Sequence, residues 1–240
     1  MSARRSPAEV VFVPGFMQHG AAWRAVTSVL GERHRTTALD PRATSFEGRL
    51  AEIGAAAEGA ALVGYSMGGR LALHAAVQAP RRLRALAVVG ASAGIEDGAE
   101  RARRRRADED LAAWIESRPI DAVVERWESA PVFASQSPEL RAAQRPGRLD
   151  HDPRELAALL RSAGQGALPP IWDRLAGITC PTLTLAGELD RDYVAAARRI
   201  AALVPCGEAR VIAGAGHAPQ LEAPEEVAEA LLDFLDEHLR

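Results

Sequence analysis

The stretch Ala61-Leu62-Val63-Gly64-Tyr65-Ser66-Met67-Gly68-Gly69-Arg70 decides the fold. Its first five residues are an apolar run that favours a strand, and apolar side chains recur at helical spacing after Gly69. The Gly-x-Ser-x-Gly pattern between these two segments is typical of a sharp strand-to-helix turn, whose glycines let neighbouring backbone approach. Such a turn presents the Ser66 hydroxyl at a helix N-terminus, which favours developing negative charge. We therefore predict a catalytic Ser66 rather than a structural turn serine.

Strand and helix patterns alternate on both sides of this stretch. Apolar runs predict further strands at residues 10–13, 36–39, 83–89, 182–187 and 209–213. Helical spacing predicts helices at residues 21–30, near residues 50–53, and at 194–203 and 224–239. Strands that are apolar throughout, alternating with helices, are typical of a parallel sheet covered on both faces. The sequence therefore predicts an α/β fold with a mostly parallel sheet of about six strands.

The alternation stops between about residues 96 and 170, where every pattern is helical. The stretch Asp152-Pro153-Arg154-Glu155, for example, has the N-cap acid, first-turn proline and third-position glutamate of a helix start. We predict that residues 96–170 form a helical cap, an insertion and not an independent domain. Residues 1–95 and 171–240 then form the core.

Composition limits the classes of partner. The 240 residues carry a net charge of −3, which gives no general attraction to nucleic acid or to anionic membranes. No apolar run reaches the roughly 18 residues that span a bilayer, and the polar segment Met1–Glu9 is not a signal peptide. We therefore expect a cytoplasmic protein with no nucleic-acid or membrane partner, either a monomer or a weak homo-oligomer.

The basic and sulfur-containing residues further limit which catalytic groups and binding sites the chain can form. Every one of the 29 basic residues is arginine, which excludes a catalytic lysine and suits the binding of carboxylates. Cys180 and Cys206 lie at or near the starts of two predicted strands, and we expect buried or half-buried thiols there. Because no cysteine and histidine cluster has metal-ligand spacing, we expect no metal site.

Polar residues follow three of the predicted strands, at the edge of a parallel sheet where sites form. Ser66 follows the third strand, Gly187-Glu188-Leu189-Asp190 the fifth, and Gly214-Ala215-Gly216-His217 the sixth. The order serine, aspartate, histidine is that of the α/β-hydrolase fold. Neutral His217 then accepts the Ser66 proton, while Asp190 orients the imidazole and stabilises its charged form.

Two neighbouring acids compete with Asp190 for this role, namely Glu188 and Asp192. The remaining histidines have no comparable context, and we interpret most of them as surface or helix residues: His19, His34, His74, His151 and His238. The oxyanion hole requires two backbone N–H groups. We predict that Met67 supplies one, next to the nucleophile, and that Phe16 supplies the other from the loop after the first strand.

Arg70 lies four residues after Ser66, one helical turn along the same helix. A guanidinium in that place suits an anionic substrate, although the spacing also fits a surface ion pair. The cap contains further arginines, most of which we expect on a solvated helix face: Arg101, Arg103, Arg104, Arg105, Arg106, Arg141, Arg145 and Arg148.

Two stretches of the predicted cap identify a family more specifically than the serine turn does. The first is Trp127-Glu128-Ser129-Ala130-Pro131-Val132-Phe133-Ala134-Ser135, and the second is residues 164–172. Both stretches resemble the 2-succinyl-6-hydroxy-2,4-cyclohexadiene-1-carboxylate synthases. That family has a Trp-x-x-x-Pro-x-Phe-Ala-Ser stretch, which is similar to the first, and a Gly-x-Gly-x-x-x-x-x-Trp segment, which is similar to the second. Residues 64–70 resemble that family's serine turn, arginine included. The resemblance extends over nearly the whole chain, whereas general esterases share only the triad.

The resemblance implies a lyase of menaquinone biosynthesis that eliminates pyruvate from 2-succinyl-5-enolpyruvyl-6-hydroxy-3-cyclohexene-1-carboxylate, a small anionic substrate with several carboxylates. It implies carboxylate-binding roles for Arg70, Arg105 and Arg148, and a pocket shaped by Trp127 and Tyr65. Because arginines flank Arg105 in the chain, its match to the family's arginine is ambiguous by one position.

In that family the implied step is not hydrolysis. The Ser66–His217 pair removes a ring proton as a general base, and the oxyanion hole stabilises charge on the succinyl carbonyl oxygen. No metal or organic cofactor is implied. The chain departs from the family at Pro14, where histidine is usual, but the neighbouring oxyanion donor is a backbone group that this change need not remove.

Two other functions stay open. The same triad suits a serine esterase or a C–C hydrolase acting on a small acidic substrate. The fold also accommodates non-catalytic binding proteins. Release of pyruvate from the enolpyruvyl substrate separates the lyase from both alternatives.

Overall fold

A computed structural model describes residues 7–239, so residues 1–6 and 240 of the predicted core, with most of the Met1–Glu9 segment, lie outside the described residues. One sheet contains six strands in the order β2-β1-β3-β4-β5-β6, and every pair of neighbours is parallel. The strands are β1 (Glu9–Val13), β2 (Arg35–Ala38), β3 (Ala61–Tyr65), β4 (Ala85–Val89), β5 (Thr182–Gly187) and β6 (Gly207–Ile212). The predicted parallel sheet is therefore confirmed.

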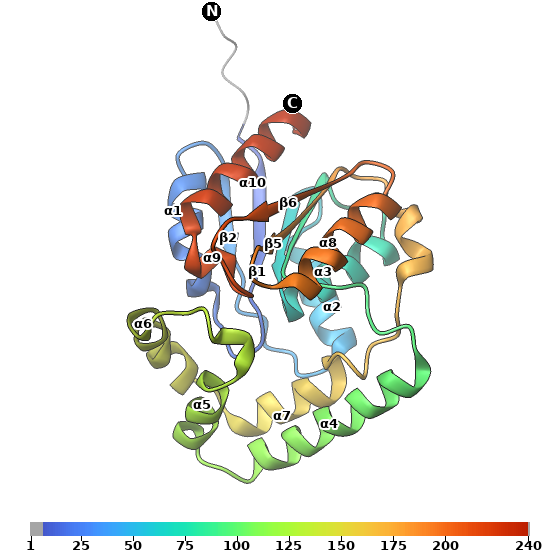
Figure 1. Ribbon diagram of the computed structural model, residues 1–240. Coiled ribbons are helices and arrows are strands. Elements are labelled where there is room, and N and C mark those ends of the chain that lie inside the picture. Colours follow the sequence, from blue (N-terminus) through green and yellow to red (C-terminus); the bar gives the residue numbers. More distant parts are fainter. Residues whose placement is uncertain (1–6, 240) are drawn as a thin grey trace, which may run out of the picture.

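Alternating side chains of β1 enter two separate hydrophobic cores, one on each face of the sheet. Val10 and Phe12 pack with α1 (Arg24–Leu30) and α10 (Pro224–His238). Val11 and Val13 pack on the opposite face, which is covered by α2 (Phe46–Ala56), α3 (Met67–Gln78) and α8 (Arg191–Leu203). Figure 1 shows these two helical layers with the sheet between them. Because both faces are covered, β3, β4 and β5 are buried along their whole length.

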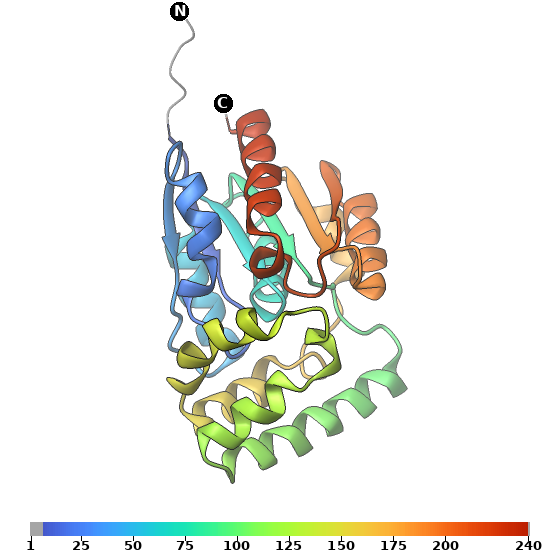
Figure 2. The same cartoon turned by 60° about the vertical axis from the view of Figure 1, so that its left-hand side comes forward.

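Four helices lie between β4 and β5 in the chain: α4 (Gly98–Glu116), α5 (Ile120–Glu128), α6 (Pro138–Leu149) and α7 (Pro153–Ala163). Figures 1 and 2 show them gathered across one end of the sheet. The sequence predicts helices throughout residues 96–170 but does not locate α6, because Pro146 interrupts the usual helical pattern there. The N-terminus of α6 is nonetheless capped, because the Ser137 hydroxyl accepts a hydrogen bond from Leu140 N (3.1 Å).

The remaining elements are short. They are η1 (Gly20–Trp23), η2 (Pro131–Phe133), η3 (Trp172–Gly177) and α9 (Pro219–Glu222). The helix predicted at residues 21–30 is thus η1 followed by α1. Among the described residues, no helix is both long and apolar enough to cross a membrane.

The two cysteines differ from each other. Cys180 is buried, and its burial raises the pKa of the thiol to about 11. Cys206 is exposed, so the expectation of a buried or half-buried thiol is wrong there. The apolar pattern of residues 209–213 suggests a buried strand, but β6 lies at the edge of the sheet, and its residues before Ile212 are half-buried or exposed.

Candidate active site

Ser66 occupies a strained turn between β3 and α3. Its φ is 49°, a left-handed conformation that a non-glycine residue adopts only when its surroundings enforce it. The Ser66 N–H donates to Val89 O of the neighbouring strand (2.9 Å). A Cβ at Gly68 would overlap the carbonyl oxygens of Val13 and Pro14. The glycine therefore lets the start of α3 rest directly on the end of β1.

Three side chains from three different elements meet at this turn. Ser66 Oγ lies 3.1 Å from His217 Nε2, and His217 Nδ1 lies 2.7 Å from Asp190 Oδ2. The Nδ1–H donates to the carboxylate, which leaves Nε2 to accept the serine hydroxyl proton. His217 is 6 % exposed. This arrangement can remove a proton from a bound molecule or activate the serine hydroxyl as a nucleophile.

The two rival acids do not contact the imidazole. Glu188 is exposed and its carboxylate accepts a hydrogen bond from Gly214 N (2.9 Å), while Asp192 lies in the first turn of α8. Asp190 is the acid that the structure places against His217, at the point where β5 passes into α8. A side chain at this position follows a strand end, so it reaches the same sheet edge as Ser66.

Glu222 holds the loop that contains His217. Its Oε2 accepts from Gly216 N (2.9 Å) and its Oε1 from Ala218 N (3.0 Å), the two residues that flank the histidine. Charge-assisted hydrogen bonds of this kind are stronger than neutral ones. Sequence reasoning missed Glu222, because nothing in the spacing of a glutamate on a short helix shows which backbone groups it will contact.

The two predicted oxyanion donors come from loops that touch each other. A Cβ at Gly15 would lie 2.8 Å from the ring of Tyr65, so the loop after β1 packs against the serine turn. Within the described part of the chain, no hydrogen bond uses the N–H of Phe16 or of Met67. Met17, next to Phe16, has a φ of 56°, which bends the loop sharply. Among the described residues, both N–H groups therefore lack a protein acceptor, as oxyanion donors must.

Aromatic rings surround the histidine. The rings of Tyr193 and Tyr65 have centroids 4.6 Å and 5.5 Å from that of His217. Tyr65 is buried, and the burial raises the pKa of its hydroxyl well above the usual value. Trp127 contacts Phe16 of the core (5.3 Å between centroids) and Phe133 of the cap (5.5 Å). Sequence reasoning missed Tyr193 and Phe133 as neighbours of the imidazole.

Arg70 points from α3 toward the cap. Its Nη2 donates to Ala163 O at the end of α7 (3.4 Å), and its Nε is buried with no protein acceptor among the described residues. Burial lowers the pKa of this guanidinium from its ordinary value. No carboxylate in the described chain forms an ion pair with Arg70. The position therefore does not fit the surface ion pair that spacing alone allowed.

Arg148 is also buried, with only 2 % of its surface exposed. Its Nη1 donates to Glu128 Oε1 (3.1 Å) and its Nη2 to Gln144 Oε1 (3.2 Å). Its guanidinium lies 5.7 Å from the ring centre of Phe133. Because Arg145 also pairs with Glu128, this cluster keeps one surplus positive charge next to the aromatic residues around the histidine.

Arg105 does not join this group. It is exposed on α4 and lines a surface pocket with Arg106 and Glu109. Its neighbour Arg104 is the cap residue whose charge affects Arg70, and it pairs with the buried Asp108 (2.7 Å). The structure thus does not bring Arg105 to this group, and Arg104 acts on Arg70 only through its charge. A helix turns by about 100° per residue, so neighbouring side chains face different surroundings.

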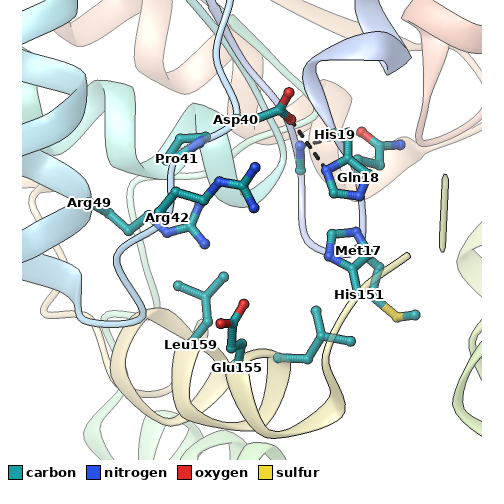
Figure 3. Close-up of a pocket in the computed structure, with 12 residues that line it drawn as sticks. Met17, Gln18, His19, Asp40, Pro41, Arg42, Arg49, His151, Glu155 and Leu159 are labelled. Carbon is teal, nitrogen blue, oxygen red and sulfur yellow. Dashed lines mark hydrogen bonds and ion pairs between the residues drawn. The ribbon is translucent and has the colours of Figure 1, made fainter. Parts of the chain in front are cut away.

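Two of the remaining histidines form a contact between core and cap. The imidazoles of His19, in the loop after β1, and His151, between α6 and α7, lie 4.2 Å apart in a stack. Figure 3 shows them at a pocket that also contains Arg42 and Glu155, with the dashed line joining His19 to Asp40 (3.3 Å). The stack fixes the end of the loop that carries Phe16.

Two further histidines are buried. His74 is a helix residue, as the interpretation allows, whereas His34 lies outside any helix, so the interpretation as a surface or helix residue is wrong for it. His74 lies on α3 against the ring of Phe46, and burial lowers its pKa to about 4. His34 accepts a hydrogen bond from Ala8 N (3.3 Å). A single histidine in a polar stretch gives no sequence signal of its burial, which depends on what packs over it.

Comparison with known proteins gives a consistent result. The Alpha/beta hydrolase family matches residues 10–230. A 2-succinyl-6-hydroxy-2,4-cyclohexadiene-1-carboxylate synthase from Escherichia coli O1:K1 / APEC is 34% identical over 174 residues, 72% of this chain and 67% of that protein. A Bacillus subtilis (strain 168) protein, named provisionally for the same activity, is 33% identical over 72% of this chain. The matched part spans 65% of the Bacillus protein, slightly less than two thirds.

Solved structures show the same fold over the whole chain. The structure of MenH from S. aureus has a TM-score of 0.91 at 28% identity, and covers 100% of this chain and 98% of that one. A thermophilic esterase from Thermogutta terrifontis has a TM-score of 0.77 at 24% identity, covering 98% of this chain and 92% of that one. At that identity the esterase shares the fold alone, and the predicted α/β-hydrolase fold is confirmed.

Proposed function

The chain belongs to the alpha/beta hydrolase family, in the group whose curated members are named 2-succinyl-6-hydroxy-2,4-cyclohexadiene-1-carboxylate synthase, and we propose that it catalyses the reaction of that name. It eliminates pyruvate from 2-succinyl-5-enolpyruvyl-6-hydroxy-3-cyclohexene-1-carboxylate and leaves the cyclohexadiene product. The placement of Arg70 carries this proposal. It lies one helical turn after Ser66, its Nε is buried, and no carboxylate among the described residues pairs with it, which suits a substrate that brings its own carboxylates.

The chemistry begins with a proton transfer. His217, held by Asp190 through Nδ1, takes a ring proton through Ser66, whose hydroxyl lies 3.1 Å from Nε2. The electron pair of the broken C–H bond passes into the ring and onto the succinyl carbonyl oxygen. The free N–H groups of Phe16 and Met67 stabilise the resulting charge. The electron pair then returns from the carbonyl oxygen into the ring, where it forms the second double bond as the bond between the ring and the enolpyruvyl oxygen breaks. The imidazolium of His217 gives its proton to the departing enolpyruvate, which becomes pyruvate.

The cap supplies walls of the substrate site and part of the positive charge that binds the substrate. Arg70 and Arg148 bind substrate carboxylates, while Trp127 and Phe133 exclude water beside the imidazole. Arg104, rather than Arg105, adds positive charge near Arg70. On this proposal residues 96–170 work as a cap on the core and do not fold alone. The protein works in the cytoplasm on a small acid, with no nucleic-acid or membrane partner, as a monomer or a weak homo-oligomer.

Hydrolysis is the second candidate, because the distances between Ser66, His217 and Asp190 suit acyl transfer to the serine equally well. A serine esterase or a C–C hydrolase for a small acidic substrate would use the same oxyanion donors. The two candidates differ in whether Ser66 becomes acylated.

The deciding experiment measures pyruvate. The enolpyruvyl substrate is generated in situ by the preceding enzyme, and pyruvate is followed with lactate dehydrogenase and NADH. We expect release that depends on this protein and is lost in Ser66→Ala. A wild-type protein that releases no pyruvate but rapidly hydrolyses a nitrophenyl ester overturns the lyase proposal in favour of the hydrolase.

A further inference from the structure

Tyr193 has a ring with a structural role and a hydroxyl without one. It lies in the first turn of α8, three residues after Asp190, so both side chains lie on the same side of the helix start. Its ring centroid is 4.6 Å from that of His217, with ring planes 56° apart. The hydroxyl, in contrast, forms no hydrogen bond with any described residue. Packing on the imidazole therefore accounts for the ring but leaves the hydroxyl unexplained.

The Tyr193 hydroxyl is accessible. The residue is half-buried, and its oxygen is not one of the polar atoms that the described chain seals off without a partner. Ser66 is half-buried in the same way, whereas His217, which contacts both residues, is 6 % exposed. Ser66 and Tyr193 are therefore two accessible side chains, each with a hydroxyl, that share the imidazole as a neighbour.

Arg70 has a second donor group near Tyr193 that lacks a partner. Its Nη2 donates to Ala163 O (3.4 Å), while its Nη1 forms no hydrogen bond with the described residues and, unlike its Nε, is not sealed off. Burial lowers the pKa of this guanidinium, and Tyr193 is the first electrostatic influence that opposes the burial. After burial, Tyr193 is also the first influence on the raised pKa of Tyr65. Because such influences weaken with distance, the phenol lies near both residues.

The carboxylate near Arg70 does not satisfy its guanidinium. Asp108 acts on Arg70 through its charge, yet both of its oxygens are bonded elsewhere. Oδ1 accepts from Arg104 Nε (2.7 Å), and Oδ2 accepts from Gly166 N (2.9 Å). One carboxylate therefore lies near two arginines, and the cluster keeps a surplus positive charge. This charge and the open Nη1 suit an anion that comes from outside the chain.

We propose that Arg70 and Tyr193 bind one carboxylate of the substrate together, the guanidinium through Nη1 and the phenol by donating its hydroxyl hydrogen. An ionised carboxylate accepts from both donors, and charge-assisted hydrogen bonds of this kind are strong. Arg70 lies one helical turn after Ser66 and Tyr193 contacts His217, so the pair holds the substrate beside the groups that move the proton. This inference rests on the proposed function, and it makes Tyr193 a specificity-determining residue.

The test is Tyr193→Phe, which keeps the ring against His217 and removes only the hydroxyl. This variant should fold, because the hydroxyl forms no hydrogen bond with the described residues. Calorimetric titration of the intact protein measures the affinity for each product, the cyclohexadiene acid and pyruvate. The product that carries the bound carboxylate should bind about tenfold more weakly or worse, and the other should stay within about twofold. In turnover, KM should rise by a similar factor while kcat stays within about threefold, as expected for a group that binds the ground state and the transition state equally.

A double-mutant cycle tests whether the two residues bind the same carboxylate. Arg70→Met keeps part of the side-chain stem and removes the charge. In that background the effect of Tyr193→Phe on affinity should be smaller by about threefold or more, because a shared ligand group couples the two losses. Arg103→Ala, on the exposed face of α4, provides the control background, in which Tyr193→Phe should keep its full effect.

The outcomes separate this inference from the proposed function. Unchanged affinity for both products in Tyr193→Phe, or an effect of equal size in the Arg70→Met background, overturns the inference, while pyruvate release by the wild type still supports the lyase. A wild-type protein that binds the products but releases no pyruvate overturns the elimination, and the titrations still decide the role of Tyr193. A wild-type protein that binds neither product overturns both.

Discussion

The imidazole rings of His19 and His151 are nearly parallel, with planes 7° apart and centroids separated by 4.2 Å. One ring belongs to the core loop that follows β1, and the other to the junction between two cap helices. His19 lies between two carboxylates, Asp40 (3.3 Å) and Asp150 (3.7 Å). The stack therefore joins the cap to the loop after β1 that carries Phe16.

The stack makes stability depend on pH. Burial, with a smaller contribution from the neighbouring His19, lowers the pKa of His151 from its ordinary 6.5 to about 4. Because the unfolded chain binds this proton more readily, the contribution to stability is complete above pH 6.5 and is lost as the pH falls toward 4. His151→Phe keeps the stacked ring but cannot titrate. We expect the free energy of unfolding, measured with urea, to fall less steeply between pH 6.5 and 4 in this variant.

His74 titrates in the same window for the same reason, since burial also lowers its pKa to about 4. It lies elsewhere, against Phe46, so a His74→Leu and His151→Phe double variant should combine the two effects additively. An unchanged slope in the double variant would contradict this assignment of the acid sensitivity.

Glu222 should affect the rate more than the affinity. Glu222→Gln leaves one acceptor for the two N–H groups of Gly216 and Ala218, so the His217 loop loses a charge-assisted hydrogen bond. We expect kcat to fall about tenfold or more while KM changes little, and Glu222→Asp to recover part of the loss. The control is Glu188→Gln. The exposed Glu188 carboxylate accepts one hydrogen bond among the described residues, from Gly214 N, and this variant should stay near wild-type activity. Equal losses in both variants would show a general effect on the loop.

Ser66 should never form an acyl intermediate. In the proposed elimination it relays a proton, so intact mass spectrometry during turnover should show only the unmodified chain. Ser66→Ala should lower kcat by about 10²- to 10⁴-fold, because the relay to His217 is lost. A covalent adduct that accumulates with the enolpyruvyl substrate would favour the hydrolase mechanism instead.

Arg70 should be essential for the anionic substrate. Arg70→Ala removes a buried guanidinium whose Nε has no protein acceptor among the described residues, and we expect kcat/KM to fall on the order of 100-fold. Arg70→Lys should recover little, because an ammonium group cannot form the same paired hydrogen bonds. The matched control is Arg103→Ala on the exposed face of α4, with an expected change below about twofold. Small and equal effects would contradict a substrate role for Arg70.

Two glycines give opposite predictions for stability. A Cβ at Gly64 would overlap the Gly68 carbonyl, and since both positions are buried backbone, we expect Gly64→Ala to destabilise the fold by about 1–3 kcal/mol or more. Nothing lies within 4 Å of a Cβ at Gly54 in the middle of α2, where alanine should stabilise by about 0.5–1 kcal/mol. Thermal unfolding of the two variants measures both effects, and similar midpoints would refute the packing argument at the serine turn.

The sequence by itself determined the sheet and the order of the triad. Apolar strands with turn residues at their ends are local patterns, and parallel strands bring their carboxyl ends to one edge whatever the loops between them do. For that reason Ser66, Asp190 and His217 could be predicted as neighbours, although 151 positions separate the serine from the histidine. The family resemblance of the cap stretches also needed only the order of residues.

The tertiary structure alone decided which polar groups meet. The sequence could not distinguish Arg104 from Arg105, because a rotation of one residue on α4 changes what a side chain faces. Nor could it find Glu222 or Tyr193, whose contacts depend on where α9 and the first turn of α8 pack against the core. Burial and hydrogen bonding depend on residues distant in the chain, and local patterns have no information about them.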